Sequence, residues 1–220
     1  MLLAIVAFYY YFCLPKQLFK DPIATVITSS SGELLGTSIA GDGQWRFPKS
    51  DSIPYKFKTC ILLFEEEYFY KHPRFNPISI FKTLKQNLSL GTVKRDGSTI
   101  TQQVIRLSRK GQSRTYIEKI KELIFATRLE LWLSKDDILN LYSSYAPFGG
   151  NIVGLEAASW RYFNRSASDL SWGESATLAV LPNAPSLIYL GKNQKRLLDK
   201  RNRLLKNYSF ELYNPLPNIV

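Results

Sequence analysis

Hydrophobic and polar positions change their period several times along the chain, and each change predicts a different element. Leu2 to Leu14 is a run of thirteen uncharged residues. As a helix it would span roughly 20 Å, against a bilayer hydrocarbon core of about 30 Å. Both a buried core helix and a membrane anchor fit this run. We favour the anchor, with Lys16 and Lys20 at the lipid headgroups.

The following stretch has the pattern of a small β element. Residues 24–28 and 34–39 are rich in β-branched and aliphatic side chains, and they flank a Ser-Ser-Ser-Gly sequence. This arrangement predicts a hairpin. Trp45 and Phe47 are candidates for anchoring the hairpin region to the main body of the protein.

From Pro54 onward, apolar residues recur with a helical period. Thr99 and Ser134 are good N-caps, and Thr99 with Gln102 fits a capping box. The basic, glycine-containing residues 91–97 predict a mobile loop. The predicted helices cover residues 80–88, 100–109, 114–133, 135–142, 154–163, 171–181 and 201–208. The sequence therefore predicts a mainly α protein with a membrane anchor at 1–14, a linker and β-hairpin region at 15–50, a main domain at 51–206 and a tail at 207–220.

Composition narrows the classes of function. The 220 residues carry a formal net charge of +11, which favours an anionic partner such as nucleic acid, anionic lipid or a phosphorylated substrate. The chain has one histidine and two separated cysteines. These numbers argue against a zinc site built from histidine and cysteine, and against a structural disulfide.

Three consecutive carboxylates, at residues 65–67, follow the apolar run 60–64 and precede an aromatic trio and His72. A solvated acidic helix end explains such a run by itself. A carboxylate beside aromatic rings in a cleft would instead be partly desolvated and suited to general base catalysis. A lone histidine such as His72 is more often a packing or hydrogen-bonding residue.

Two further segments favour the catalytic interpretation. Residues 97–103, Gly-Ser-Thr-Ile-Thr-Gln-Gln, combine a glycine, hydroxyls, amides and a helix start, which suit sugar and phosphate oxygens. An ordinary capped helix is the simpler alternative. Glu122 lies on the apolar stripe of the next helix, where a carboxylate needs a cationic partner or a polar cleft. Two glutamates with an anion-friendly loop suggest glycosyl chemistry on a phosphorylated sugar.

These segments, in this order, resemble the five motifs of the peptidoglycan glycosyltransferase domain, family 51, of class A penicillin-binding proteins, above all the 1C subtype. Residues 65–76, 97–103, 119–122, 134–142 and 201–205 match the motifs, and residues 43–48 and 146–151 point to the subtype. The resemblance extends over roughly residues 15–206. It implies a lysozyme-like fold with a larger head and a smaller, membrane-associated jaw.

The resemblance also implies a reaction, the polymerisation of lipid II with inversion at the anomeric carbon. Glu65 would take the proton of the acceptor hydroxyl, and Glu122 would help to stabilise the departing diphosphate. A divalent cation, Mg²⁺ or Mn²⁺, at an unknown site would assist. The substrate-binding residues implied or proposed as candidates are His72, Gly97, Ser98, Thr99, Gln102, Gln103, Arg106, Lys119 and Lys135.

The same family places the protein in the bacterial inner membrane as a single-pass protein, with the catalytic domain on the periplasmic side. Its partners would be lipid II, the growing glycan strand, membrane lipid and other cell-wall synthesis proteins, with no nucleic acid. The Ser-x-x-Lys spacing at residues 79–82 lacks the accompanying transpeptidase motifs, so penicillin binding is not expected.

Four positions depart from the family pattern: Arg74, Asp96, Glu118 and Ser144. Three hypotheses follow. The chain is an active glycosyltransferase; or it is a hydrolase on a similar fold that uses Glu65 as an acid; or it is a catalytically impaired remnant of a bifunctional protein that only binds lipid-linked substrate or partners. We favour the first hypothesis.

Overall fold

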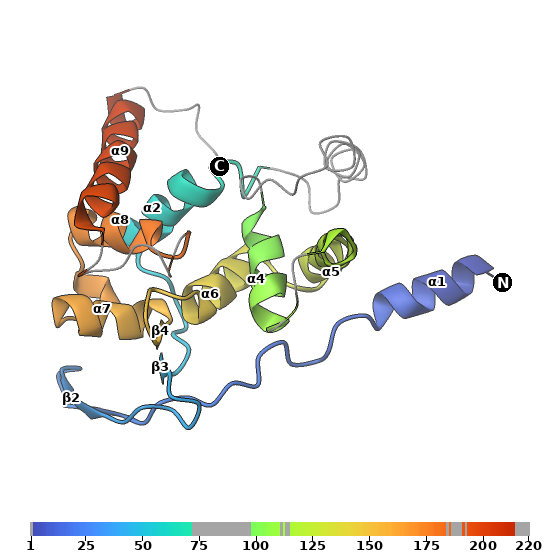
Figure 1. Cartoon of the computed structure of the whole chain (residues 1–220), viewed down its shortest axis with the longest axis horizontal. Helices are drawn as coiled ribbons and strands as arrows, with labels where there is room; N and C mark the ends of the chain where they lie inside the picture. Colours follow the sequence, from blue (N-terminus) through green and yellow to red (C-terminus); the bar gives the residue numbers. More distant parts are fainter. Residues whose placement is uncertain are drawn as a thin grey trace. The chain divides into compact units, whose positions relative to one another are not determined.

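The computed structural model describes residues 2–71, 98–110, 112, 115–183, 185, 191 and 193–213. In these residues the chain is mainly helical, as predicted (Figure 1). It divides into two compact units. Unit 1 comprises Met1–Lys20 and Tyr68–Tyr142, and unit 2 comprises Asp21–Glu67 and Ser143–Val220. The head-and-jaw arrangement and the domain boundaries at residues 14, 50 and 206 stay predictions.

Three helices form the core of unit 1: α4 (Ile100–Ser108), α5 (Tyr116–Trp132) and the greater part of α6 (Lys135–Tyr145), whose last three residues belong to unit 2. The apolar faces of α4 and α5 pack together and bury Ile105 and Leu129 completely. The starts of all three helices agree with the sequence prediction to within two residues, because each has a hydroxyl N-cap.

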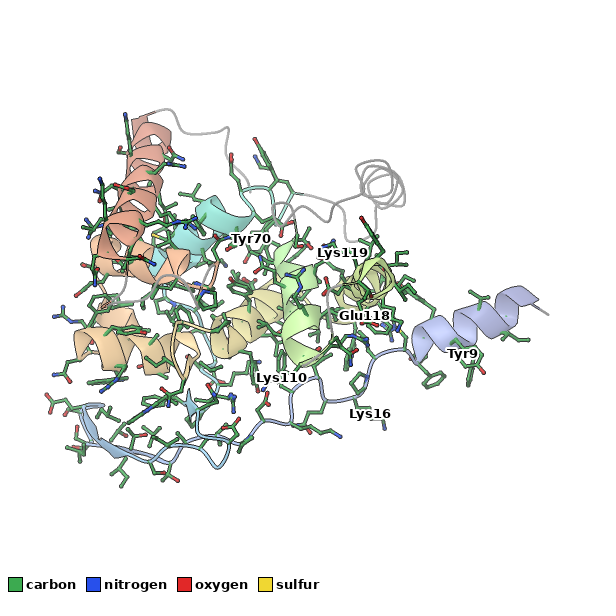
Figure 2. All side chains as sticks on the ribbon, in the orientation of Figure 1. Tyr9, Lys16, Tyr70, Lys110, Glu118 and Lys119 are labelled. Atoms are coloured by element: carbon green, nitrogen blue, oxygen red, sulfur yellow. The ribbon has the colours of Figure 1, made fainter. Side chains whose placement is uncertain are left out.

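The N-terminal helix α1 (Leu2–Tyr11) forms inside the segment predicted as a membrane anchor. Its aromatic side chains, such as Tyr9, are largely exposed (Figure 2). Its last turn contacts α5, where the hydroxyls of Tyr10 and Thr127 are 3.0 Å apart and the guanidinium of Arg128 lies over the ring of Tyr11. In the part of the chain that the structure describes, no helix is both long enough and apolar enough to cross a bilayer.

Unit 2 is organised around α2 (Tyr55–Glu65), which packs against α8 (Trp172–Val180) and α9 (Gln194–Tyr213). Phe57, Cys60 and Ile61 form the buried face of α2. The neighbouring α7 (Leu155–Phe163) and the short 3₁₀ helix η1 (Ala167–Asp169) complete the helical part. A capping box between Ser171 and Glu174 begins α8 at the predicted place.

The predicted hairpin is confirmed. Strands β1 (Val26–Thr28) and β2 (Leu34–Thr37) pair antiparallel, with Val26 opposite Thr37. The chain then adds β3 (Trp45–Arg46), which pairs in parallel with β4 (Ile152–Val153). This second pairing, together with the burial of Phe47, fixes the N-terminal part of unit 2 to its helical part, as the sequence suggested for Trp45 and Phe47.

Two predictions about helices need comment. The helix predicted over residues 201–208 is much longer, because α9 begins at Gln194 and continues to Tyr213. Its first three residues, Gln194 to Arg196, are exposed and polar, and the buried Leu197 and Leu204 form its apolar face. The helix predicted over 80–88 and the loop predicted over 91–97 lie outside the described residues.

Candidate functional site

The candidate site in unit 1 begins at the N-terminus of α4. Thr99 has an extended backbone conformation, and its Oγ1 accepts a hydrogen bond of 3.2 Å from the backbone N–H of Gln102. This hydrogen bond is one of the two that a capping box between Thr99 and Gln102 would contain. The side chain of Gln102 turns instead toward α5, so the cap both begins the helix and leaves an amide oxygen for a cation.

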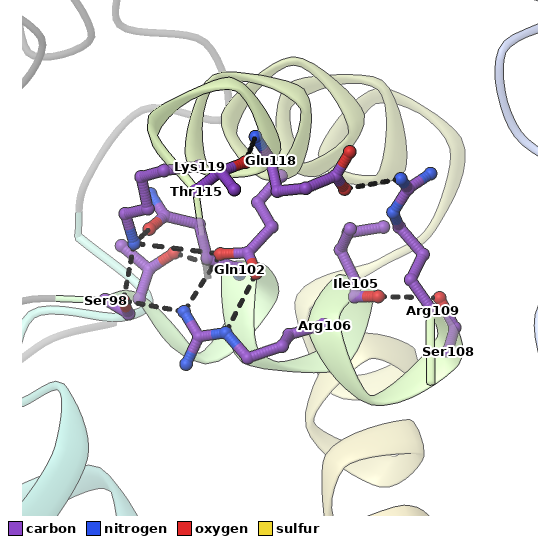
Figure 3. Close-up of polar contacts among 11 residues, drawn as sticks. Ser98, Gln102, Ile105, Arg106, Ser108, Arg109, Thr115, Glu118 and Lys119 are labelled. Carbon is purple, nitrogen blue, oxygen red and sulfur yellow. Dashed lines mark hydrogen bonds and ion pairs between the residues drawn. The ribbon is translucent and has the colours of Figure 1, made fainter. Parts of the chain in front are cut away.

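Arg106 on α4 and Glu122 on α5 form a two-pronged ion pair. The Nε and Nη2 atoms of Arg106 each donate to one carboxylate oxygen of Glu122 at 2.9 Å (Figure 3). Glu122 is 9% exposed, on the buried stripe of α5 that the sequence predicted. The parallel geometry is the strong form of a carboxylate–guanidinium contact, so it fixes the orientation of both side chains.

A second cation, Lys119, completes the cluster. Its Nζ donates to Ser98 Oγ at 2.6 Å and to Gln102 Oε1 at 3.0 Å, and it lies 3.8 Å from Glu122. Ser98 also accepts from Arg106 at 3.0 Å. The structure thus brings together five residues of the predicted site: Ser98, Gln102, Arg106, Lys119 and Glu122. We call them the Glu122 cluster.

The charges of the Glu122 cluster favour an anion. Two cations face one carboxylate, so a net charge of about +1 remains next to the N-terminus of α4, which adds its own partial positive charge. The side chains of Arg106 and Lys119 keep 32% and 18% of their surface exposed. An anionic ligand can therefore reach both cations. Gln103 lies half-buried on the same helix.

Glu65, the proposed general base, is the last residue of α2 in unit 2. It is half-buried, whereas Glu67 two positions later is exposed. The helix ends here because Glu66 leaves the helical conformation, with φ −164° and ψ 81°. A carboxylate at the C-terminus of a helix opposes the helix dipole, so helix stability alone does not account for Glu65 at this place.

Lys135, predicted as a substrate-binding cation, lies in unit 1 in a different environment. Its Nζ is 2.7 and 2.9 Å from the two carboxylate oxygens of Glu130, and 4.4 Å from the ring centroid of Phe69. Thr101 Oγ1 donates to the same carboxylate. Glu130 is not among the predicted site residues, and Thr101 lies in the predicted segment 97–103 without an assigned role. The sequence does contain one indication of this pair: Lys135 follows Glu130 by five positions, and Glu130 lies near the end of an apolar helix.

Two of the four departures from the family pattern lie in the described residues. Glu118 accepts from Arg109 at 2.6 Å and from Lys121 at 2.7 Å, and these hydrogen bonds, from Lys121 first, hold the pKa of its carboxyl below the usual range.

Ser144 on α6 lines a cavity of unit 2 together with Gly154. A β-carbon at position 154 would lie 2.7 Å from the Ser144 carbonyl oxygen. The other departures, Arg74 and Asp96, and the predicted site residues His72 and Gly97 lie outside the described residues.

The expected divalent cation finds no ready site in what the structure describes. No group of three or more acidic, histidine or cysteine side chains gathers among residues 2–71, 98–110, 112, 115–183, 185, 191 and 193–213. Glu122 lies within the candidate anion site, and both of its oxygens are engaged by Arg106. A metal site stays a prediction, and Arg106 and Lys119 provide positive charge without one.

Comparisons with known proteins identify the family that this chain is similar to. A family model described as Transglycosylase matches residues 32–209. The chain is 38% identical over 198 residues to penicillin-binding protein 1C of Escherichia coli, covering 90% of this chain and 26% of that protein. It is 32% identical over 191 residues to penicillin-binding protein 1A of Neisseria flavescens, covering 87% and 24%. The crystal structure of penicillin-binding protein 1A from Haemophilus influenzae aligns with a TM-score of 0.45 at 20% identity, covering 89% of this chain and 19% of that one.

The family match defines a glycosyl-transferring class of protein. The chain belongs to the transglycosylase family, the glycosyltransferase domain of class A penicillin-binding proteins. Its similarity to penicillin-binding protein 1C confirms the resemblance to that subtype. The chain spans about a quarter of the length of the curated relatives it matches.

Proposed function

We propose that this protein is a peptidoglycan glycosyltransferase that polymerises lipid II into glycan strands during cell wall biogenesis. The Glu122 cluster carries the proposal, because it holds two cations beside a helix N-terminus, an arrangement suited to a departing diphosphate. The family match over residues 32–209 supports the same reaction and gives no preference to a catalytically impaired remnant.

In the proposed mechanism, Glu65 removes the proton from the 4-hydroxyl of the acceptor sugar. The hydroxyl oxygen then attacks the anomeric carbon of the donor from the face opposite the leaving group, with inversion. A new carbon–oxygen bond forms, and the bond to the diphosphate breaks. Undecaprenyl diphosphate leaves with the electron pair, and the proton stays on Glu65.

The Glu122 cluster acts on the leaving group. Arg106 and Lys119 would bind the diphosphate oxygens and stabilise the charge that develops on them. Glu122 holds Arg106 by its bidentate contact, and Ser98 and Gln102 hold the ammonium of Lys119. Thr99, Gln103, Gly97 and His72 would contact the sugars or the diphosphate. If Mg²⁺ or Mn²⁺ binds, it would add positive charge at the diphosphate.

We also propose that the protein works at the periplasmic face of the bacterial inner membrane, where lipid-linked substrate is presented. The exposed apolar side chains of α1 and the net charge of +11 suit an anionic bilayer surface. Lipid II, the growing glycan strand, membrane lipid and other cell-wall synthesis proteins are the proposed partners.

The test uses the detergent-solubilised chain with labelled lipid II, with and without Mg²⁺ or Mn²⁺, and separates products by size. We expect long glycan chains from the wild type and a loss of at least 10³-fold in rate for Glu65→Gln, because the base is removed. Lys121→Met, outside the Glu122 cluster, is the matched control and should retain activity. A folded wild type that binds lipid II without forming polymer would support the impaired remnant instead, and shortening of preformed glycan would support a hydrolase.

A further inference from the structure

Lys135 differs from the other two cations of the proposed site in its exposure. Its side chain keeps 10% of its surface exposed, compared with 32% for Arg106 and 18% for Lys119. Its ammonium faces both oxygens of Glu130, which is itself 5% exposed. A buried ammonium with a carboxylate partner is poorly placed to bind a diphosphate, so a structural role suits Lys135 better than direct contact with the substrate.

The pair at Glu130 and Lys135 joins segments that are distant in sequence. Glu130 lies in the last turn of α5 and accepts from Thr101 in the first turn of α4. Lys135 begins α6 and lies over the ring of Phe69, which is completely buried. The pair therefore connects α4, α5, α6 and the segment that contains Phe69.

The residue after Lys135 adds a second attachment to the same segment. Asp136 Oδ1 accepts from the hydroxyl of Tyr70 at 2.7 Å. Neighbouring residues of α6 thus hold neighbouring residues of the segment 68–71, and two adjacent contacts restrict its orientation more than one would. We call Phe69, Tyr70, Thr101, Glu130, Lys135 and Asp136 the α6 hub.

The α6 hub is linked to the Glu122 cluster through the first turn of α4. Thr101 is the residue before Gln102, whose amide oxygen accepts from Lys119, so its contact with Glu130 fixes the start of α4 relative to α5. Phe69 follows the proposed base Glu65 by four residues in the sequence.

We propose that Lys135 and Glu130 are positioning residues for glycosyl transfer, which act through Phe69 and Thr101 and not by contact with the diphosphate. This inference rests on the proposed function. It predicts that the two side chains work as one unit: loss of either one disorders the same contacts, and loss of both costs no more activity than loss of one. It also predicts that the loss lies in kcat, with little change in KM.

The experiment compares Lys135→Met, Glu130→Gln and the double variant Glu130→Leu with Lys135→Met, using the full chain in detergent. Because an apolar pair of similar volume can replace a buried ion pair without loss of stability, the double variant should remain folded. We expect kcat on lipid II to fall about 10- to 100-fold in all three, with KM and the Kd for undecaprenyl diphosphate changed less than threefold. Lys121→Met removes an exposed lysine that also pairs with a glutamate at 2.7 Å, and it should leave kcat unchanged.

Amide hydrogen exchange gives a readout that does not depend on activity. Peptides covering residues 68–71 and 98–103 should exchange faster in the folded double variant than in the wild type, and Lys121→Met should leave both unchanged. If Lys135→Met weakens undecaprenyl diphosphate binding tenfold or more while Glu130→Gln has no effect, Lys135 is a substrate contact and the proposal is wrong. Unchanged exchange in the double variant would also overturn it. An inactive wild type would contradict the proposed function, and exchange would still decide the role of the hub.

Discussion

Two ion-pair clusters on α5, eight residues apart, use similar chemistry in opposite environments. At Glu122 the partners are Arg106 and Lys119, which keep a substantial part of their side chains exposed. At Glu130 the partner is Lys135, and both side chains are nearly enclosed. Each glutamate also connects α5 to α4, through Arg106 in one case and Thr101 in the other.

The difference in exposure separates the two roles. Enclosed charges lose most of their hydration, so they depend on each other and make the contact between helices specific. Partly exposed cations keep access to solvent, so they can exchange water for an anionic ligand. The comparison teaches that residue type at a motif position does not fix its role. A lysine serves the substrate at position 119 in our proposal, and a lysine serves the framework at position 135.

The largest effect on stability should come from the enclosed cluster. Lys135→Met leaves the carboxylate of Glu130 buried without its main partner, which we expect to lower the free energy of unfolding by about 3–5 kcal/mol. Urea unfolding followed by circular dichroism measures the change.

The double variant Glu130→Leu with Lys135→Met sharpens this expectation. With the charge removed from both sides, most of the stability should return, to within roughly 1–2 kcal/mol of the wild type, since the cost of an isolated buried charge is gone. If the losses in the free energy of unfolding caused by the changes at Glu130 and Lys135 simply add in the double variant, the two side chains do not depend on each other. The contrast between the two clusters would then be wrong.

Arg106→Lys at the exposed cluster should affect stability less. A lysine keeps the charge and loses the two parallel hydrogen bonds to Glu122, so we expect a loss of about 1 kcal/mol in the free energy of unfolding. Activity on lipid II should nevertheless fall at least tenfold, because the guanidinium would no longer be held in place for the diphosphate. Urea unfolding and polymerisation assays on the same preparation measure both. A stability loss as large as that of Lys135→Met would show that the Glu122 cluster is structural in the same sense.

Much of this picture could be predicted from the sequence. The N-cap at Thr99, the burial of Glu122 on the apolar stripe of α5 and the cations Arg106 and Lys119 all follow from local patterns and motif spacing. The hairpin followed from β-branched runs around a turn sequence. These features depend on neighbours within a few positions, and such neighbours determine caps, helical faces and tight turns.

The features that could not be predicted depend on partners distant along the chain. The pairing of β3 with β4 joins residues 45 and 152, and the contact between Lys135 and Phe69 spans 66 positions. A charged residue at a helix start looks the same in sequence whether it is enclosed or exposed. For this reason Lys135 was grouped with Arg106 and Lys119, although its surroundings differ. The length of α9 was underestimated because its buried positions Leu197 and Leu204 are separated mostly by charged side chains, which weakens the apolar period.

The smallest effect should come from a third cluster on α5, at Glu118. Its partner Lys121 is exposed, so this cluster shows what an ion pair contributes when one partner stays in solvent. Its carboxyl pKa lies below the ordinary glutamate value of 4.5, because Lys121 and Arg109 donate hydrogen bonds to it. A group with a lowered pKa contributes stability above the unfolded-state pKa, and that contribution is lost as the pH falls through the folded-state pKa. The urea midpoint of Glu118→Gln should therefore lie slightly below that of the wild type at pH 7, and the two midpoints should converge as the pH falls through the lowered folded-state pKa.

Salt provides the control for Glu118, because added salt screens a partly exposed pair such as Glu118 and Lys121 more than an enclosed one. At 1 M NaCl the pH 7 difference between the wild type and Glu118→Gln should shrink, whereas the loss caused by Lys135→Met should persist. A difference for Glu118 that is insensitive to both pH and salt would mean that its carboxylate acts through packing and not through charge. Exposure would then not be the property that separates the clusters of α5.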